Sequence, residues 1–378
     1  MPRVRKLRFV LVVLAAWVSL SPASGAQGSG QGSFASQVRA LSEPGGFFDT
    51  DNLVSNERSY LHVMTDLRQK RVSGGAYVGV GPDQNFSYIA AVRPSVAYII
   101  DVRRDNLLLH LLFKSLFAVS TTRVEYLSRL FGREIPEPLN PWRTASLEKI
   151  VVEIETASVR PDTVEALRTR LDRAIAGFDV PLSREDFAAI SRFHRSFIGG
   201  GLSLKFQTLG RTPRPSYPTY RDLLLETDRA GRRSSYLASE DDFQFVRAMQ
   251  QRDLIIPLVG NLGGPSAMEA VAGEIGRRGE RLSAIYVSNV EGYLFNDGLF
   301  TRYAKNLATF PRHERSVVIR SVFNNPGLAF RPGVLPGHVS ASLVQSLDDF
   351  EKDVAAGKYR SYQDLVVASS IHGSATAR

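Results

Sequence analysis

The sequence predicts an α/β protein with a mostly parallel, doubly wound sheet and a helical insertion. Three observations favour this fold class. Short apolar runs end in glycine or in an acidic residue, as buried parallel strands often do. These runs alternate with segments of helical spacing in the first and last thirds of the chain. The stretch between them, residues 120–250, shows mainly helical spacing.

The first strand, turn and helix are expected between residues 76 and 92. Residues 76–81 form a short apolar run that ends in glycine, which indicates a buried strand. Residues 82–85 make a turn, and residues 86–92 have helical spacing until Pro94 stops the helix.

A second strand and helix follow directly. Residues 96–100 predict another buried strand, which ends at Asp101. Residues 106–119 are apolar on nearly every side of a helix, so we expect that helix to be buried. The resulting βαβα unit requires a parallel strand pair covered by helices.

The same alternation resumes after the insertion. Strands are expected at 254–259, 282–287 and 316–322, and a helix at 266–278 follows the glycine-rich turn 260–265. Within the insertion, helices are expected at 161–178 and 182–198, and Gly199–Gly201 is expected to be an exposed loop.

These elements divide the chain into four parts. We predict a signal peptide at 1–26, a linker at 27–45, the α/β domain at 46–330 and a C-terminal extension at 331–378.

The N-terminus has the pattern of a secretory signal. Basic residues are followed by an apolar run over residues 9–20 and by small residues up to Ala26. This run is shorter than the roughly 20 residues of a membrane-spanning helix. We therefore predict export to the periplasm or medium with cleavage near Ala26, and an uncleaved N-terminal anchor is the alternative.

Composition excludes several classes of site. The chain has no cysteine, so neither disulfides nor thiolate metal sites are possible. Removal of residues 1–26 takes away four basic residues and no acid, which lowers the formal charge from +9 to +5. No lysine-rich block with interleaved aromatics is present, so we expect a small-molecule ligand, no nucleic acid and no membrane span in the mature chain.

A ligand site is expected where the predicted strands end. In open α/β sheets, ligands bind beyond the carboxyl ends of the strands. Gly79 and Gly81 allow a ligand to approach the backbone, and the following helix offers unpaired N–H groups. Asp101 lies twenty residues after Gly81, where an acid can accept hydrogen bonds from ribose hydroxyls. We assign cofactor binding to the following residues: Gly79, Gly81, Gln84, Asn85, Asp101 and Asn261.

Other polar residues near strand ends are weaker candidates. Asn289 and Glu291 follow a later strand and either line the pocket or serve turn chemistry. Glu57 and Tyr60 precede the first strand and could fold over a ligand. The six histidines show no ligand spacing in the sequence, and no hydrolase motif is present, so no catalytic residue is assigned.

Five segments resemble an uncharacterised bacterial family with a methyltransferase-like Rossmann fold, typified by a leptospiral protein. The segments are 55–60, 77–86, 100–108, 235–240 and 286–295. The resemblance implies a fold like that of class I S-adenosylmethionine-dependent methyltransferases. It also implies that Gly79 and Gly81 match the first motif and Asp101 the acid that closes the second strand. The chain departs from that pattern because no acid begins the first-motif strand and no Asn-Pro-Pro-Tyr-type motif follows a later strand.

Two functional hypotheses follow. The first is a methyltransferase-like protein that binds S-adenosylmethionine, with an unknown acceptor. The second is an exported, non-catalytic Rossmann-fold protein that binds another small ligand or a partner. The predicted leader favours the second hypothesis, because S-adenosylmethionine is a cytoplasmic metabolite, and the glycine and aspartate arrangement favours the first.

Overall fold

We analysed a computed structural model of the chain, which describes residues 32–210, 212, 214–323 and 333–374. The predicted signal peptide, residues 1–26, lies outside the described residues. Within the described part of the chain, no helix combines the length and the apolar character needed to cross a membrane.

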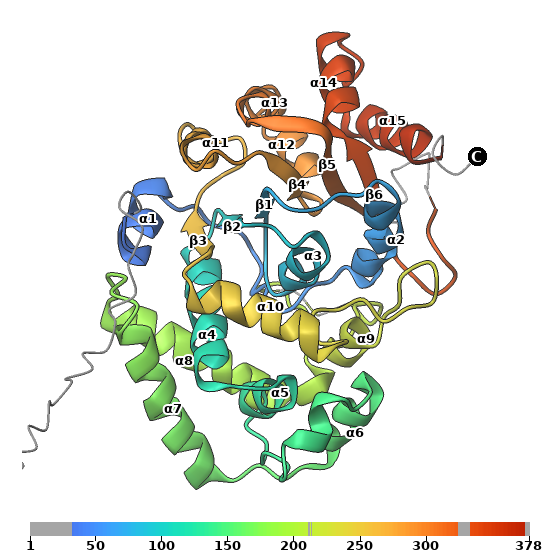
Figure 1. Cartoon of the computed structure of the whole chain (residues 1–378). Coiled ribbons are helices and arrows are strands. Elements are labelled where there is room, and N and C mark those ends of the chain that lie inside the picture. The colour runs from blue at the N-terminus through green and yellow to red at the C-terminus, as the bar shows by residue number, and fades with distance from the viewer. Residues whose placement is uncertain (1–31, 211, 213, 324–332, 375–378) are drawn as a thin grey trace, which may run out of the picture. The chain divides into compact units, whose positions relative to one another are not determined.

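A single six-stranded sheet organises the domain, in the order β3-β2-β1-β4-β5-β6 (Figure 1). Strands β1 to β5 pair in parallel, whereas β6 runs antiparallel to β5. The α/β class and the mostly parallel sheet are therefore confirmed. The strands are β1 (Ala76–Gly79), β2 (Val96–Asp101), β3 (Ile255–Val259), β4 (Leu282–Tyr286), β5 (Arg312–Phe323) and β6 (Ser340–Ser346).

The strand order reverses beside β1. The chain first adds β2 and β3 on one side of β1 and then returns to add β4 and β5 on the other. Helices cover both faces of this sheet (Figure 1). One face carries α3 (Gln84–Val92), α4 (Arg104–Val119) and α10 (Glu240–Gln251), and the other carries α11 (Ala267–Arg277), α12 (Val290–Asn296) and α13 (Phe300–Ala308).

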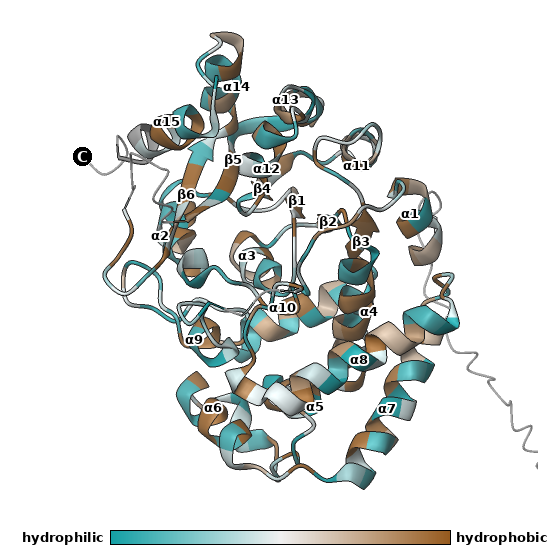
Figure 2. Cartoon of the chain, turned by 180° about the vertical axis from the view of Figure 1, so that it is seen from behind, coloured by the Kyte–Doolittle hydropathy of each residue, from teal (hydrophilic) through white to brown (hydrophobic). Residues whose placement is uncertain are grey.

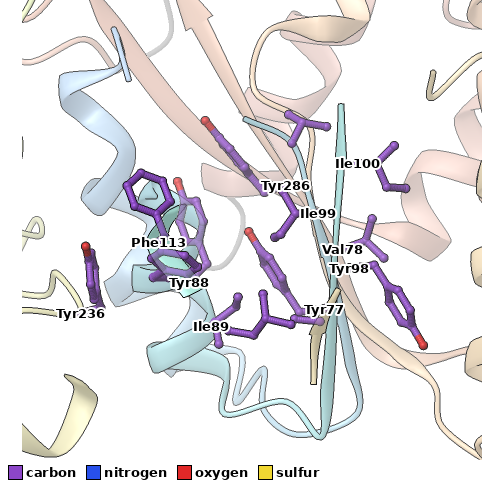
Figure 3. Packing of buried hydrophobic residues seen from close by; sticks show 14 of the residues in the cluster. Tyr77, Val78, Tyr88, Ile89, Tyr98, Ile99, Ile100, Phe113, Tyr236 and Tyr286 are labelled. Carbon is purple, nitrogen blue, oxygen red and sulfur yellow. The ribbon is translucent and has the colours of Figure 1, made fainter. Parts of the chain in front are cut away.

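Side chains alternate across β1 and β2, as the two-residue period of a strand requires. Tyr77 and Ile99 point toward α3, and Val78 and Tyr98 point to the opposite face (Figure 3). All four are completely buried. This explains why these strands appear in the sequence as continuous apolar runs rather than as an alternating pattern.

Helix α4 is buried, as its sequence predicts. It packs against β2, β3, α7, α8 and α10, and much of its surface is hydrophobic (Figure 2). The polar Lys114 is buried in this helix because its ammonium group pairs with Asp253 at 2.6 Å and lies 4.5 Å from the Phe34 ring centre.

The predicted insertion is helical. Gly199 and Gly200 do not form the exposed loop expected from the sequence, because α8 continues to Gly200 and a 3-10 turn follows. Buried Phe193 and Phe197 hold this last part of α8 in place. The helices are α5 (Arg123–Leu130), η2 (Asn140–Arg143), α6 (Leu147–Thr156), α7 (Pro161–Ala176), α8 (Arg184–Gly200), η3 (Gly201–Ser203) and α9 (Tyr220–Leu224).

The linker predicted at 27–45 needs correction, because α1 (Phe34–Leu41) occupies much of it. Phe34, Val38 and Leu41 lie on one face of this short helix and are buried against β3 and α11. The spacing of these three residues is helical, but so short a pattern is easily overlooked beside a glycine-rich stretch.

The C-terminal extension predicted at 331–378 also needs correction, because it completes the sheet. Strand β6 pairs with β5 over residues 340–346, and α14 (Leu347–Ala355) and α15 (Tyr362–Ser374) pack against these two strands.

A buried ion pair joins this last part of the fold. Arg320 on β5 donates to Glu291 on α12 at 2.6 Å, and neither side chain is more than 1% exposed. Arg320 also donates to Gln345 on β6 and to Ser369 on α15. Tyr303 on α13 completes the network by donating to Glu291 at 3.0 Å. The network around this guanidinium thus connects five separate elements.

Replacing Arg320 by methionine should destabilise the protein by about 3–5 kcal/mol, because Glu291 would remain buried without its cation. Urea denaturation measures this change in the free energy of unfolding. The matched control is Arg312→Met on the same strand, whose ion pairs are partly exposed and should contribute at most about 1 kcal/mol. Equal losses for both variants would contradict a central role for the buried pair.

Candidate functional site

A pocket of about 390 Å³ lies at the carboxyl ends of β1 to β4. We call it the edge pocket. Its walls come from the β1–α3 turn, the end of β2, the turns after β3 and β4, the segment 47–57, and residues 206, 208, 214 and 217. It therefore lies where the strand order reverses, which is the usual ligand position in an open α/β sheet.

Four of the six predicted binding residues line the edge pocket, and two do not. Gly81, Gln84, Asp101 and Asn261 contribute to its walls, together with the weaker candidates Glu57 and Asn289. Gly79 and Asn85 lie behind the pocket wall, and Glu291 is held in the buried pair with Arg320.

Asn85 has a structural role that the sequence did not reveal. Its amide nitrogen donates to the carbonyl oxygens of Val80, Gly81 and Pro82 at 2.9, 3.2 and 2.7 Å. Its amide oxygen accepts from Tyr77 at 2.8 Å. Gly79 makes room for this side chain, because a Cβ atom there would lie 1.9 Å from the Asn85 oxygen. Asn85 therefore holds the turn through hydrogen bonds, and Gly79 provides the space that its side chain needs.

Gly81 adopts a backbone conformation that favours glycine, with φ of +83°. Its carbonyl oxygen also lies 2.9 Å from Nε2 of His110 on α4. Burial lowers the pKa of His110 to about 4, so the ring is neutral at neutral pH and donates to Gly81 through Nε2. Hydrogen bonds from Asn85 on α3 and from His110 on α4 thus hold the turn in place.

Asp101 lies at the pocket but is already paired. Arg103 binds both of its carboxylate oxygens through the guanidinium, at 3.1 and 2.9 Å, and the Arg103 backbone N–H donates to it at 2.9 Å. Arg103 also donates to the carbonyls of Thr50 and Asp51. The pair therefore attaches the segment 50–51 to the end of β2. A carboxylate can accept about four hydrogen bonds, so Asp101 retains some capacity for a ligand.

The turn after β3 is closed by an internal carboxylate. Glu43 accepts from the backbone N–H groups of Asn261, Ser266 and Ala267 at 2.8 to 3.0 Å. The side-chain oxygen of Asn261 accepts from Gly263 at 2.8 Å. The N-terminus of α11 is consequently occupied by the chain itself, through the carboxylate of Glu43.

Glu57 is the most deeply buried acid of the edge pocket. It is 1% exposed and accepts hydrogen bonds from Tyr286, Ser288 and Ser321. Burial raises the pKa of its carboxyl, and the three hydroxyl donors oppose this effect. Glu57 was only a weaker candidate in the sequence, because it lies in an irregular segment before η1 (Arg58–Val63) and α2 (Met64–Gln69).

Gln84 connects the pocket wall to β4. Its side-chain nitrogen donates to the Tyr286 hydroxyl at 3.3 Å, and its side-chain oxygen is buried with no hydrogen-bond partner. A buried acceptor without a donor carries a free-energy cost, which a ligand with an N–H or O–H group could remove.

Aromatic side chains form the outer rim of the edge pocket. Phe48 contacts Tyr293 edge to face at a centroid distance of 5.0 Å, and Phe206 contacts Tyr217 at 5.3 Å. Phe47 is 81% exposed beside them. These rings offer flat apolar surfaces in a pocket that polar groups also line, an arrangement common in small-molecule sites.

Asp83 lies behind the turn, next to the pocket. It is buried and accepts from the hydroxyls of Tyr220 and Tyr236 at 2.5 and 3.2 Å. Burial raises the pKa of this carboxyl to about 6, against the lowering effect of the two tyrosine hydrogen bonds.

Replacing Asn85 by aspartate should destabilise the protein by about 3 kcal/mol or more, because a carboxylate oxygen would face three carbonyl oxygens in place of the amide donor. Urea denaturation at pH 7 measures the loss. The same change at Asn296, which is exposed at the end of α12, should cost less than about 0.5 kcal/mol. A small loss at Asn85 would show that its amide does not hold the turn.

Asp83 should make stability fall as the pH rises. The unfolded chain releases this proton near pH 3.8, whereas the folded chain retains it to about pH 6. Between pH 4 and pH 7, the wild type should therefore lose on the order of 3 kcal/mol relative to Asp83→Asn. Urea titrations across this range test the slope, with the exposed Asp105→Asn as control. Parallel pH profiles for the wild type and Asp83→Asn would refute it.

The chain matches one family model, described as a domain of unknown function (DUF7790), over residues 52–137 and 203–376. No curated protein matches the chain. Residues 138–202, between the two matched ranges, contain η2, α6, α7 and α8, so the matched ranges include all six strands. The two ranges cover more than half of the chain, and the chain therefore belongs to this uncharacterised family.

Proposed function

We propose that the edge pocket binds a nucleoside-containing small molecule, with S-adenosylmethionine as the ligand to test, and that the sheet is a Rossmann-like, doubly wound one. The observation that carries this proposal is the position of the pocket at the strand-order reversal, between Gly81 on one side and Asp101 on the other.

The order of the strands supports the fold assignment. The order 3-2-1-4-5-6 is that of dinucleotide-binding sheets, in which ligands lie at the reversal point. The antiparallel β6 is a departure from an all-parallel sheet, but it lies at the far edge, next to β5. The strands that form the pocket are all parallel.

The residues around the pocket suit parts of such a ligand. Gly81 allows close approach to the backbone, and the Gln84 oxygen lacks a donor. Asp101 has the position expected for an acid that accepts from ribose hydroxyls, with its orientation fixed by Arg103. The aromatic rim, with Phe48 and Tyr293, offers surfaces for a planar base. The volume of about 390 Å³ is within the usual range of small-molecule sites.

S-adenosylmethionine supplies an electrophilic methyl group, which passes to a nucleophilic atom of an acceptor as the carbon–sulfur bond breaks. The chain would contribute mainly proximity and orientation. An oxygen or nitrogen acceptor also loses a proton, and Glu57 is the buried carboxylate at the pocket wall that could accept it. Glu57 is held by three hydroxyl groups and is thus positioned before any acceptor binds.

A second candidate function rests on the Asp101–Arg103 pair. Arg103 donates hydrogen bonds to both oxygens of Asp101, so a ribose diol would have to share this carboxylate with Arg103. Arg103 and Arg214 both line the pocket, which favours a ligand with an anionic group. This observation supports a non-catalytic binding protein for another small ligand, and the predicted export of the chain agrees with it.

Calorimetry on the purified chain with S-adenosylmethionine and S-adenosylhomocysteine separates the two functions. We expect micromolar binding for the wild type and weakening by at least about tenfold, or 1.4 kcal/mol, in Asp101→Ala. Asp105→Ala is the matched control, because this acid is exposed and lies outside the pocket wall. Absence of heat with both ligands in a folded wild type would refute the proposal and leave the second function.

A further inference from the structure

A cluster outside the edge pocket brings together residues from three distant segments. His62 lies in η1, Glu226 follows α9, and His338 precedes β6. Each offers one ligand atom, and these atoms lie within 4.8 Å of one another. We propose that His62, Glu226 and His338 bind a divalent transition-metal ion, with zinc as the ion best suited to the site.

The chemistry of the donor set favours zinc. Two imidazoles and one carboxylate are a recurrent zinc ligand set that leaves a position for water. In tetrahedral zinc sites the ligand atoms lie about 3.3 Å apart, given bond lengths of about 2.0–2.1 Å. The Glu226 oxygens lie 3.5 Å from Nε2 of His62 and 3.2 Å from Nε2 of His338. These contacts involve the two different oxygens of Glu226, so the three side chains would need to move closer together to bind one ion.

The surroundings of His338 are compatible with a bound metal ion. Its Nδ1 faces the carbonyl oxygen of Pro336 at 3.3 Å, and its Nε2 faces Glu226. Both ring nitrogens therefore face acceptors, and a neutral ring has only one N–H to donate. A protonated ring donates to both acceptors, and a metal ion at Nε2 also fits, because Nδ1–H then donates to the carbonyl. Metal-bound histidines usually have such a second hydrogen bond.

The fold already holds the two histidines near each other. Ser59 of η1 lies 2.8 Å from Ser340 and 3.2 Å from Ser342 of β6, hydroxyl to hydroxyl. His62 is one 3-10 turn after Ser59, on the same side of the helix, and His338 is two residues before Ser340. The rings of His62 and His338 are 4.8 Å apart, centre to centre. His62 is 2% exposed, and its Nδ1 is buried without a partner.

Arg58 is the competing cation at this cluster. Its Nε donates to Glu226 at 2.8 Å, but its side chain is 41% exposed and can turn toward solvent. Metal binding and the Arg58 pair thus compete for the same carboxylate. In a chain without cysteine, the metal would connect η1, the segment after α9 and the segment before β6, which no disulfide can join.

The test uses the full chain without an affinity tag, prepared free of metal with a chelator. Titration with Zn²⁺ alone should give one site with a dissociation constant of about 10 μM or tighter, and Co²⁺ should give the visible absorption of a four- or five-coordinate ion. Zinc should also raise the thermal midpoint, because it binds the folded chain.

The variants His62→Ala and His338→Ala should each weaken zinc binding by at least about tenfold. His313→Ala is the matched control, because this histidine lies at the start of β5 and outside the cluster. Arg58→Gln should leave zinc affinity unchanged or increase it, since the competing cation is removed. An ion-pair cluster without a metal site would instead give no zinc uptake by the wild type.

Three results would overturn the proposal. One is a folded wild type that takes up no zinc or cobalt, and another is binding that persists in both histidine variants. The third is a loss of binding in Arg58→Gln equal to that in the histidine variants. If His62→Ala does not fold, His62→Gln and His338→Ala give the same information.

Discussion

The position of Asn85 is the constraint on which the candidate site depends. Parallel strands end together at one edge of the sheet, and the chain must turn sharply there to begin α3. The Asn85 amide binds three successive carbonyl groups of this turn, and Gly79 provides the space for it. The turn is consequently rigid before any ligand arrives, which lowers the entropy cost of binding.

The chain partly closes its own strand ends. Glu43 occupies the N-terminus of α11, and Arg103 ties residues 50 and 51 to the end of β2. Both contacts involve the segment before β1, which crosses the edge of the sheet and forms one wall of the edge pocket. The pocket remains because this segment passes over the reversal point without filling it.

The two ends of the short helix η1 contact different sites. Glu57, at its start, faces the edge pocket and the hydroxyls of β4 and β5. His62, near its end, faces Glu226 and His338. Ser59 lies between them and contacts β6. Metal binding at the histidines would therefore stabilise the same helix that positions the pocket carboxylate, and the two sites could be coupled through it.

The sequence by itself determined the α/β class, the first five strands and the buried helix α4, because hydrophobic periodicity depends only on local spacing. It also identified four pocket residues, since glycine and acidic residues at strand ends are local signals. Only the tertiary structure decided that Asn85 supports the turn, that Arg103 pairs with Asp101, and that His62 meets His338. These contacts join residues far apart or behind a turn, and their partners depend on how the sheet and its helices pack in three dimensions.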